Sequence, residues 1–348
     1  MSNYNELDDS VKLILENALS PHKVSGTIKL KGDASYRSYY RITTESSDKT
    51  FILMRWNPEL TNKSEEASKN LFIKESPFIN ILKYLKKINI PVPEIIYHNI
   101  DVGMIILEDL GDTTLERAFS SRNDFSLYEK AIKLLALLKT RTLEKPDKNC
   151  IAFLRKFDYD LYMWEFDHFI EYGIEARNNI KLPEPDKNLI RNYFSKISYE
   201  LEKFSFLFTH RDYQSRNIMI RDGNYYLIDF QDALISTPTY DLVALLRDSY
   251  IRFEEKIVND FIELYIASLN SNILKVDEAE FKRLFYLQTI QRKLKDGGRF
   301  VFIDMVKGNP SFLPYIPNSF TYARDAINKF NEFKELHKTI AKYVPEFQ

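Results

Sequence analysis

A chain of 348 residues with 44% hydrophobic and 28% charged side chains is long enough to bury two modest cores or one large one. Its 49 Lys and Arg residues nearly balance 50 Asp and Glu residues, which argues against a nucleic-acid-binding protein. Cys150 is the single cysteine, so no disulfide forms within the chain. Neither a secretory signal nor an apolar run long enough to span a bilayer is evident, and we expect a cytoplasmic protein without membrane contact.

The first 108 residues predict a mostly antiparallel sheet. An amphipathic helix is expected over 7–20, and the period then changes to that of strands. Short β-type runs separated by polar turns follow, namely TIKL, SYYRITT and TFILM. A helical segment is expected over 63–89. Pro91 and Pro93 then open two more strands that end near Glu108.

After residue 108 the pattern becomes helical. We expect helices over 113–140 and 155–205, one small hairpin, and further helices to the end, with a Pro-rich break over 307–319. The predicted fold class is therefore α+β, with a small antiparallel sheet lobe and a large helical lobe. The predicted boundaries are 1–108 for the first lobe and 109–348 for the second, joined by a hinge at about 107–112.

The stretch Phe208–Ala233, FTHRDYQSRNIMIRDGNYYLIDFQDA, places polar groups at the ends of two apolar runs. Asp212 and Asn217 precede the first run, and Asp229 follows the second. Asp222-Gly223 between the runs is a strong hairpin signal. The end of the second strand of a hairpin lies beside the start of the first, so Asn217 and Asp229 should be neighbours. Carboxylate and amide oxygens are the ligands that Mg²⁺ prefers.

HRDYQSRN followed by IDFQD resembles the catalytic segment of the aminoglycoside phosphotransferase and choline kinase superfamily, which has a protein-kinase-like two-lobed fold. The resemblance implies ATP and Mg²⁺ as cofactors, Asp212 as the catalytic base, and Asn217 and Asp229 as Mg²⁺ ligands. His210 would brace the catalytic loop from behind. Gln231 stands where protein kinases have the glycine of their mobile D-F-G switch, so we expect no such switch.

Further segments extend the resemblance in the same order over about residues 27–325: GDASYRSYYRI, EDLGD, HRDYQSRN, IDFQDA and PTYDLVALLRDSY. Together they resemble the branch of sugar kinases that phosphorylate N-acetylmuramate and N-acetylglucosamine at the anomeric hydroxyl, in bacterial cell-wall recycling. The resemblance implies a small-molecule substrate and a monomer or weak dimer. Two alternatives remain open: a kinase for an aminoglycoside, choline or another amino alcohol, and a non-catalytic nucleotide or sugar sensor.

The nucleotide is expected between two segments of the small lobe. The loop KGDASYRSYYRI should lie above the phosphates, where Ser35 and Arg37 are candidate donors. Backbone groups from Glu108 to Leu110, on the crossing strand, would meet the adenine edge. An ordinary polar turn is the alternative interpretation of both segments.

Met54 occupies the place where the superfamily carries a strand lysine. Either another cation replaces it, with Arg37 and Lys31 as candidates, or phosphate binding depends on Mg²⁺ and backbone groups. We assign no partner among the glutamates of residues 65–75.

The acceptor is expected between the catalytic loop and the helical lobe. Glu165 lies among aromatic residues that suit a sugar face, although such a stripe also suits a core. Asp232 is a candidate metal or acceptor ligand, or else a cap. The basic segment 291–302, interrupted by a Gly-Gly break, offers Arg292 or Arg299 for the carboxylate of an acidic sugar.

Three further charged groups near the motif have predicted roles. Arg216 inside the catalytic loop either stabilises the transferring phosphoryl group or stabilises the fold. Asp241 is expected to cap its helix and brace the catalytic loop. Arg247 and Asp248 are expected to form an internal ion pair.

Overall fold

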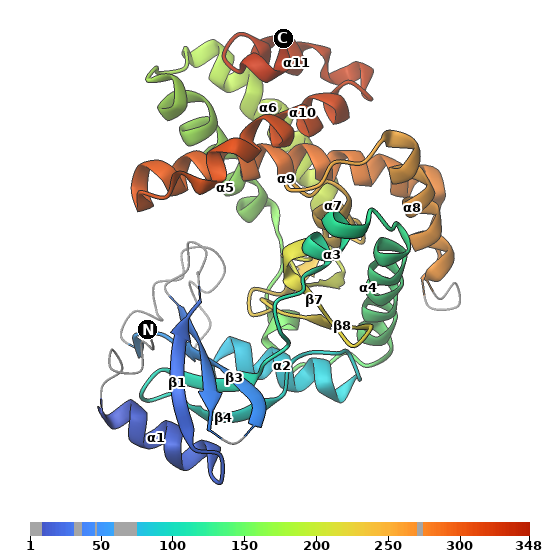
Figure 1. Cartoon of the computed structure of the whole chain (residues 1–348). Helices are drawn as coiled ribbons and strands as arrows, with labels where there is room; N and C mark the ends of the chain where they lie inside the picture. The colour runs from blue at the N-terminus through green and yellow to red at the C-terminus, as the bar shows by residue number, and fades with distance from the viewer. Residues whose placement is uncertain (1–8, 31–36, 46, 59–74, 270–273) are drawn as a thin grey trace.

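A five-stranded antiparallel sheet forms most of the small lobe, drawn at the lower left of Figure 1. The computed structural model describes residues 9–30, 37–45, 47–58, 75–269 and 274–348. The strand order is β1-β2-β3-β5-β4, and every neighbouring pair is antiparallel. The strands are β1 (Val24–Lys29), β2 (Ser38–Thr44), β3 (Ser47–Arg55), β4 (Ile95–Asn99) and β5 (Met104–Glu108).

Alternation along the strands gives the sheet two apolar faces. Leu53 and Ile106 point to one face and pack with α1 (Asp9–Leu19). Met54 and Ile105, each one residue away, belong to the core that contains α2 (Pro77–Lys87). The predicted helix over 63–89 is therefore observed in its last part, and its residues 63–74 lie outside the described residues.

The larger lobe is almost entirely helical, as the sequence predicts. Its helices are α3 (Leu115–Arg122), α4 (Ser126–Glu144), α5 (Tyr159–His168), the π-helical η4 (Phe169–Ala176), α6 (Glu184–Lys203), α7 (Tyr240–Leu246), α8 (Glu255–Ser268), α9 (Glu278–Lys307), α10 (Ile316–Ile327) and α11 (Lys334–Ala341). Side-chain caps begin several of them: Thr114, Asp158 and Asp277 each accept a hydrogen bond from the backbone three residues on. None of the helices in the described ranges is long and apolar enough for a membrane span.

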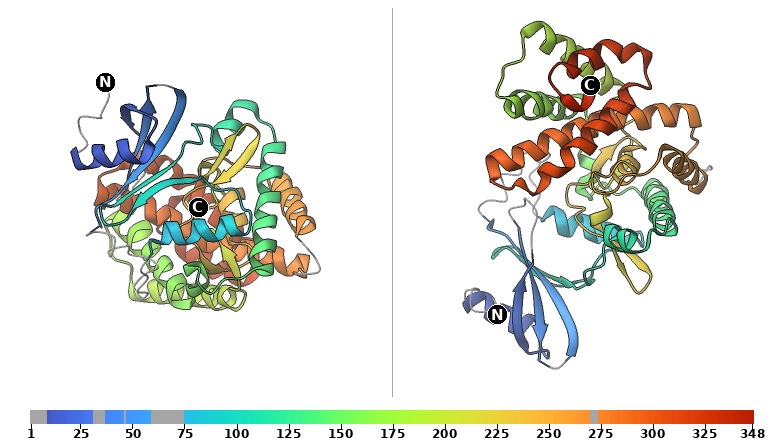
Figure 2. Two further views of the ribbon diagram at one scale, coloured as in Figure 1. Left: turned by 90° about the horizontal axis from the view of Figure 1, so that it is seen from below. Right: turned by 45° about the horizontal axis from the view of Figure 1, so that its top comes forward.

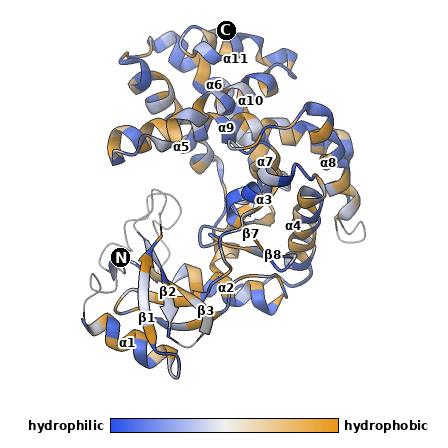
Figure 3. Ribbon diagram, in the orientation of Figure 1, coloured by the Kyte–Doolittle hydropathy of each residue, from blue (hydrophilic) through white to orange (hydrophobic). Residues whose placement is uncertain are grey.

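The two lobes lie at opposite ends of the molecule in Figure 1 and in the right-hand view of Figure 2. Most helices of the large lobe alternate polar and apolar residues along their length (Figure 3). This pattern is that of helices which pack one face on a core. The helices that follow α9 share one continuous core with α5, η4 and α6.

Helix α9 runs without a break through Gly297 and Gly298, so the predicted Gly-Gly break is wrong. The two glycines serve close packing. A Cβ on Gly297 would lie 2.1 Å from the Phe320 ring, and one on Gly298 would lie 2.9 Å from the Cα of Phe169. Because glycine has no side chain at these two positions, α10 and η4 can approach α9 closely.

Two small antiparallel pairs carry the polar motif of residues 208–233. The predicted hairpin is β7 (Ile218–Arg221) with β8 (Asn224–Leu227), and Asp222 and Gly223 take positive φ values of 51° and 77° in its turn. Such a turn matches the twist of the flanking strands. Sequence analysis did not predict the second pair, β6 (Leu207–Thr209) with β9 (Leu234–Ser236). Its strands bracket the motif and hold both ends of it together.

Candidate active site

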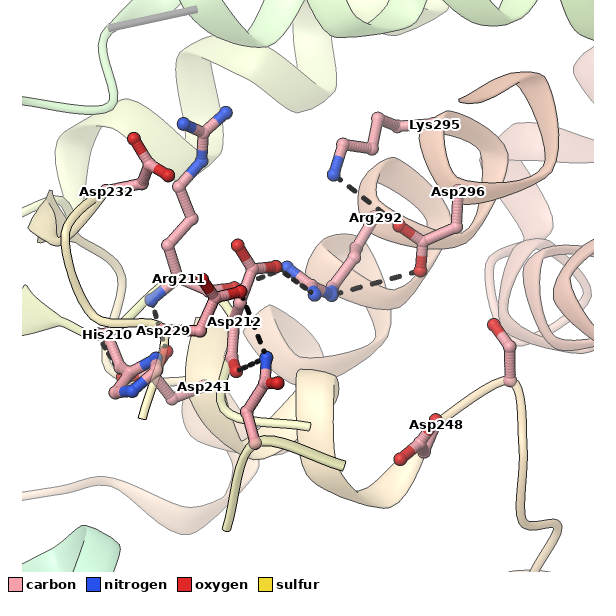
Figure 4. A network of polar contacts seen from close by, with 12 residues as sticks. His210, Arg211, Asp212, Asp229, Asp232, Asp241, Asp248, Arg292, Lys295 and Asp296 are labelled. Atoms are coloured by element: carbon pink, nitrogen blue, oxygen red, sulfur yellow. Dashed lines mark hydrogen bonds and ion pairs between the residues drawn. The ribbon is translucent and has the colours of Figure 1, made fainter. Parts of the chain in front are cut away.

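Asp212, after β6, and Asp229, after β8, lie close together (Figure 4), and Asn217, just before β7, contacts both of them. Ile218 pairs with Leu227, so the residue before β7 lies near those that follow β8. Asn217 Nδ2 donates to the backbone carbonyl of Asp212 at 3.0 Å and lies 3.5 Å from Asp229 Oδ2. The predicted neighbourhood of Asn217 and Asp229 is thus present.

The backbone of this loop is held in a conformation that most residues avoid. Arg211 and Asp229 have φ values of 76° and 64°, which are costly for residues with a side chain. Asp241 compensates by accepting the backbone N–H of His210 at 2.9 Å and that of Arg211 at 3.0 Å. Lys139 Nζ lies 2.6 Å from the same carboxylate, and both side chains are completely buried. The predicted bracing of the loop by Asp241 is observed, although its carboxylate faces the loop instead of capping α7.

The predicted ion pair between Arg247 and Asp248 is wrong. Arg247 donates to Glu255 at 2.8 and 3.0 Å. Asp248 instead accepts the backbone N–H of Ser215 at 3.0 Å and that of Tyr250 at 3.1 Å. Asp248 therefore fixes the second half of the catalytic loop, much as Asp241 fixes the first.

His210 lies behind the loop and is buried. Its ring meets the rings of Tyr213 and Phe230 edge-on, with centroids 5.8 and 6.4 Å away. Burial lowers the pKa of His210, which favours the neutral imidazole. This position suits the predicted bracing role.

The carboxylates of Asp212 and Asp229 lie close enough to influence each other. Partial burial and the nearby Asp212 raise the pKa of Asp229 to about 6. Arg37, just before β2, brings Nη1 to 4.0 Å from Asp229 Oδ1 and partly offsets that charge. Met54 is buried in the apolar core beneath the sheet. Among the described residues of the small lobe, Arg37 is the cation that pairs with this carboxylate. Ser35 and Lys31 lie outside the described residues.

The donor atoms fit a hard divalent cation held jointly with phosphates. Asp229 and Asn217 offer carboxylate and amide oxygens, and a raised carboxyl pKa marks a place that a cation would stabilise. Among the described residues, no group of three or more His, Cys, Asp or Glu side chains is arranged to hold a metal alone. Magnesium that is bound through nucleotide phosphates needs only one or two protein carboxylates.

Arg216 is held away from the two carboxylates. Its guanidinium donates to Glu116 of α3 through Nε at 3.1 Å and Nη2 at 3.0 Å. The same group stacks on Tyr250, with Cζ 3.4 Å from the ring centroid. These contacts favour a role in fixing the loop on α3 over direct contact with a phosphoryl group.

The segment predicted as a hinge, 107–112, is bound to both lobes. Asp109 accepts from Arg41 of β2 at 2.6 and 3.1 Å, and Glu108 accepts from Arg221 of β7 at 2.7 Å. Leu110 is buried. These side chains are engaged within the protein, as are the N–H of Glu108, which donates to Glu94, and the carbonyl of Asp109, which accepts from Arg221. Contact of the other backbone groups with a nucleotide base stays a prediction.

Of the three acceptor candidates, Glu165 is fully buried. Its two oxygens accept from Arg211 Nη2 at 3.1 Å and from Gln291 Nε2 at 2.6 Å. This arrangement favours bracing of the loop over contact with a sugar. Arg299 lies over the Phe302 ring, 4.7 Å from its centroid.

Asp232 is linked to Asp229 through Gln231, which sequence analysis treated only as a departure from D-F-G. Gln231 Nε2 donates to Asp229 Oδ1 at 3.0 Å and to Asp232 Oδ2 at 2.9 Å. The amide therefore joins the carboxylates of Asp229 and Asp232. The sequence signal for this bridging role of Gln231 was its position between Asp229 and Asp232.

Arg292 is misplaced by the sequence analysis, which offered it to a sugar carboxylate. Its side chain is 1% exposed and lies 3.3 Å from Asp212 Oδ1. The sequence signal for this role was a basic residue among the apolar residues of a helix, since a buried charge needs a partner within the protein.

A small antiparallel sheet, a helical lobe and an Asp-Asn-Asp cluster at their junction define a kinase-like phosphotransferase. The chain matches the phosphotransferase enzyme family over residues 27–277 and belongs to that family.

Named relatives and solved structures agree with this class. The chain is 28% identical over 314 residues to the N-acetylmuramate/N-acetylglucosamine kinase of Neisseria meningitidis, covering 90% of this chain and 89% of the relative. The choline kinase LicA from Streptococcus pneumoniae superposes with a TM-score of 0.62 at 17% identity, covering 93% of this chain and 100% of that one. ADP-bound aminoglycoside phosphotransferase APH(2'')-Ib superposes with a TM-score of 0.55 at 12% identity, covering 92% and 99%.

Proposed function

We propose that the protein transfers the γ-phosphoryl group of ATP to the anomeric hydroxyl of N-acetylmuramate or N-acetylglucosamine. The convergence of Asp212, Asn217 and Asp229 is the observation that supports phosphoryl transfer. The choice of an amino sugar rests on relatives with that activity in their names. A part in the recycling of cell-wall sugars in the cytoplasm belongs to the same proposal and rests on the resemblance to that sugar-kinase branch.

The residues of the chain divide the chemistry in a simple way. The carboxylate of Asp212 orients the acceptor hydroxyl and takes its proton, while the hydroxyl oxygen forms a bond to phosphorus and the bond to the ADP oxygen breaks. Asn217 and Asp229 would hold Mg²⁺, which supplies charge neutralisation on the phosphates when bound. Arg37 faces Asp229 from the small lobe and is positioned to contact a phosphate. Asp241 and Asp248 keep the loop rigid, so that little reorganisation is needed at the moment of transfer.

The nucleotide and acceptor are assigned to opposite sides of this cluster. The backbone of Glu108–Leu110 would meet the adenine. Asp232 is the proposed contact for a sugar hydroxyl or for the metal. Arg299 is the proposed contact for the carboxylate of N-acetylmuramate, a group that N-acetylglucosamine lacks.

The test is a kinase assay with Mg-ATP and five acceptors: N-acetylmuramate, N-acetylglucosamine, glucose, choline and kanamycin. ADP release is measured, and phosphorus NMR places the phosphate on the product. We expect turnover of the N-acetyl sugars alone, with an acid-labile anomeric phosphate. Asp212→Asn should abolish it, while Asp222→Asn in the exposed hairpin turn serves as the matched control.

Other outcomes of this assay would reject parts of the proposal. Turnover of choline or kanamycin alone would reject the amino sugar. Nucleotide binding without turnover of any acceptor, in wild type and Asp212→Asn alike, would identify a sensor.

A further inference from the structure

We propose that Arg292 of α9 is a positioning residue for the catalytic base Asp212. This inference rests on the part of the proposed function that makes Asp212 the base. It adds a residue that lies 80 positions from the catalytic loop in sequence, outside the motif that carries the resemblance to kinases.

The Arg292 guanidinium bridges two groups of the catalytic loop. Nη1 donates to the backbone carbonyl of Arg211 at 2.8 Å, and Nη2 lies 3.3 Å from Asp212 Oδ1. Figure 4 shows the side chain reaching from α9 to the Asp212 carboxylate. A planar guanidinium holds its donors in a fixed fork. One rigid group therefore sets both the backbone of the residue with φ 76° and the direction of the carboxylate that follows it.

The two arginines of the loop itself have other partners. Arg211 is paired with Glu165 at 3.1 Å, and Arg216 is paired with Glu116 at 3.0 Å. Each of these two guanidinium groups is bound by a carboxylate other than that of Asp212. Among the described residues, the guanidinium that pairs with the Asp212 carboxylate is therefore that of Arg292.

Arg292 is itself firmly held. Its side chain is 1% exposed, its Cζ lies 5.0 Å from the centroid of the Tyr240 ring, and its Nε lies 3.9 Å from Asp296 Oδ2. Asp296 is also bound by Lys293, at 2.8 Å. Because an ion pair costs less when its members are already fixed, this anchoring makes Arg292 a rigid reference for Asp212. Asp296, in turn, does not depend on Arg292 alone for a positive partner.

Lys293 provides a matched control. It is a buried cation on the same helix with the same carboxylate partner, but its other contact is Ser249 Oγ, at 2.6 Å, outside the catalytic loop. Arg292→Met and Lys293→Met therefore remove comparable buried charge beside Asp296. Only the first removes the fork on Arg211 and Asp212.

The experiment compares wild type, Arg292→Lys, Arg292→Met and Lys293→Met by steady-state kinetics and by calorimetric titration with a non-hydrolysable ATP analogue. We expect kcat of Arg292→Met to fall about 100-fold, as misplaced catalytic groups do. Arg292→Lys keeps the charge and should fold, yet its flexible ammonium lacks the planar fork that fixes the Arg211 carbonyl and the Asp212 carboxylate in one geometry, so kcat should fall about 10-fold. Affinity for the analogue should stay within about twofold in every variant, and Lys293→Met should keep its kcat within the same margin.

Two results would overturn the inference: kcat of Arg292→Lys equal to that of wild type, or an equal loss of kcat in Lys293→Met. The assay uses whichever acceptor the wild-type protein phosphorylates. Turnover of choline would therefore reject the proposed amino sugar while still deciding the role of Arg292.

Discussion

The buried ion pair between Lys139 and Asp241 yields the sharpest stability prediction. Lys139 Nζ donates to Asp241 Oδ2 at 2.6 Å and to the backbone carbonyl of Phe208 at 2.6 Å. Both side chains have zero exposure. Lys139→Met keeps the volume and removes the charge, so Asp241 is left buried with two backbone N–H donors and no cation.

Removal of one partner of a buried pair costs about 3–5 kcal/mol, because the remaining charge loses its compensation. The lost hydrogen bond to Phe208 leaves one buried carbonyl without this donor and adds to the cost. In the double variant Lys139→Met with Asp241→Asn the stranded charge is gone. The two costs should therefore be non-additive by about 2 kcal/mol.

Urea unfolding followed by tryptophan fluorescence measures these free energies, since Trp164 lies in the helical lobe. Lys133→Met, at an exposed position of the same helix, is the control and should change stability by about 0.5 kcal/mol at most. A loss below about 1 kcal/mol for Lys139→Met would refute the assignment of a charged, essential pair. Strict additivity in the double variant would do the same.

Three further predictions concern the site. Asp229→Asn should raise the unfolding free energy of the metal-free protein at pH 7.5 by about 1 kcal/mol, after discount for a side chain 42% exposed. Because the pKa of Asp229 in the folded protein is about 6, its protonated carboxyl favours the folded state at low pH, and this contribution is lost as the pH rises through 6. The stability gained by Asp229→Asn should therefore vanish at pH 4. Thermal melts in EDTA measure it, and equal gains at pH 4 and pH 7.5 would contradict the prediction. Arg41→Ala should raise KM for ATP several-fold with little change in kcat, because Arg41 ties β2 to Asp109 at the hinge; an unchanged KM would count against it. Arg299→Ala should raise KM for N-acetylmuramate about tenfold and leave N-acetylglucosamine unchanged, and parallel changes for both sugars would argue against a carboxylate contact.

The features that the sequence predicts correctly are those set by local geometry. The Asp222-Gly223 turn has two residues, so the register of β7 and β8 follows from the turn alone. That register brings Asn217 beside Asp229, and no distant part of the chain is needed. The continuous apolar runs of β3 and β5 pack on both faces of the sheet, since neighbouring strand residues point in opposite directions.

The absence of the strand lysine is visible in the sequence too, because Met54 stands at its place in TFILMRW. The structure adds that Met54 is buried. Which cation replaces the lysine is a tertiary matter. The sequence leaves Arg37, Lys31, or Mg²⁺ with backbone groups as replacements. The fold brings Arg37 Nη1 to 4.0 Å from Asp229 Oδ1, whereas Lys31 lies outside the described residues.

Only the tertiary structure decides which charges are partners. Arg211, Arg216, Glu165 and Arg292 all belong to motifs or segments that the sequence singles out, yet their partners lie 46 to 100 residues away. A charge in water has no preference among distant opposite charges, and burial creates that preference by removing solvent from one arrangement. The helical lobe therefore selects Glu165 for Arg211, Glu116 for Arg216 and Arg292 for Asp212. The sequence by itself determines the local cluster of Asp212, Asn217 and Asp229, and long-range packing determines what holds that cluster in place.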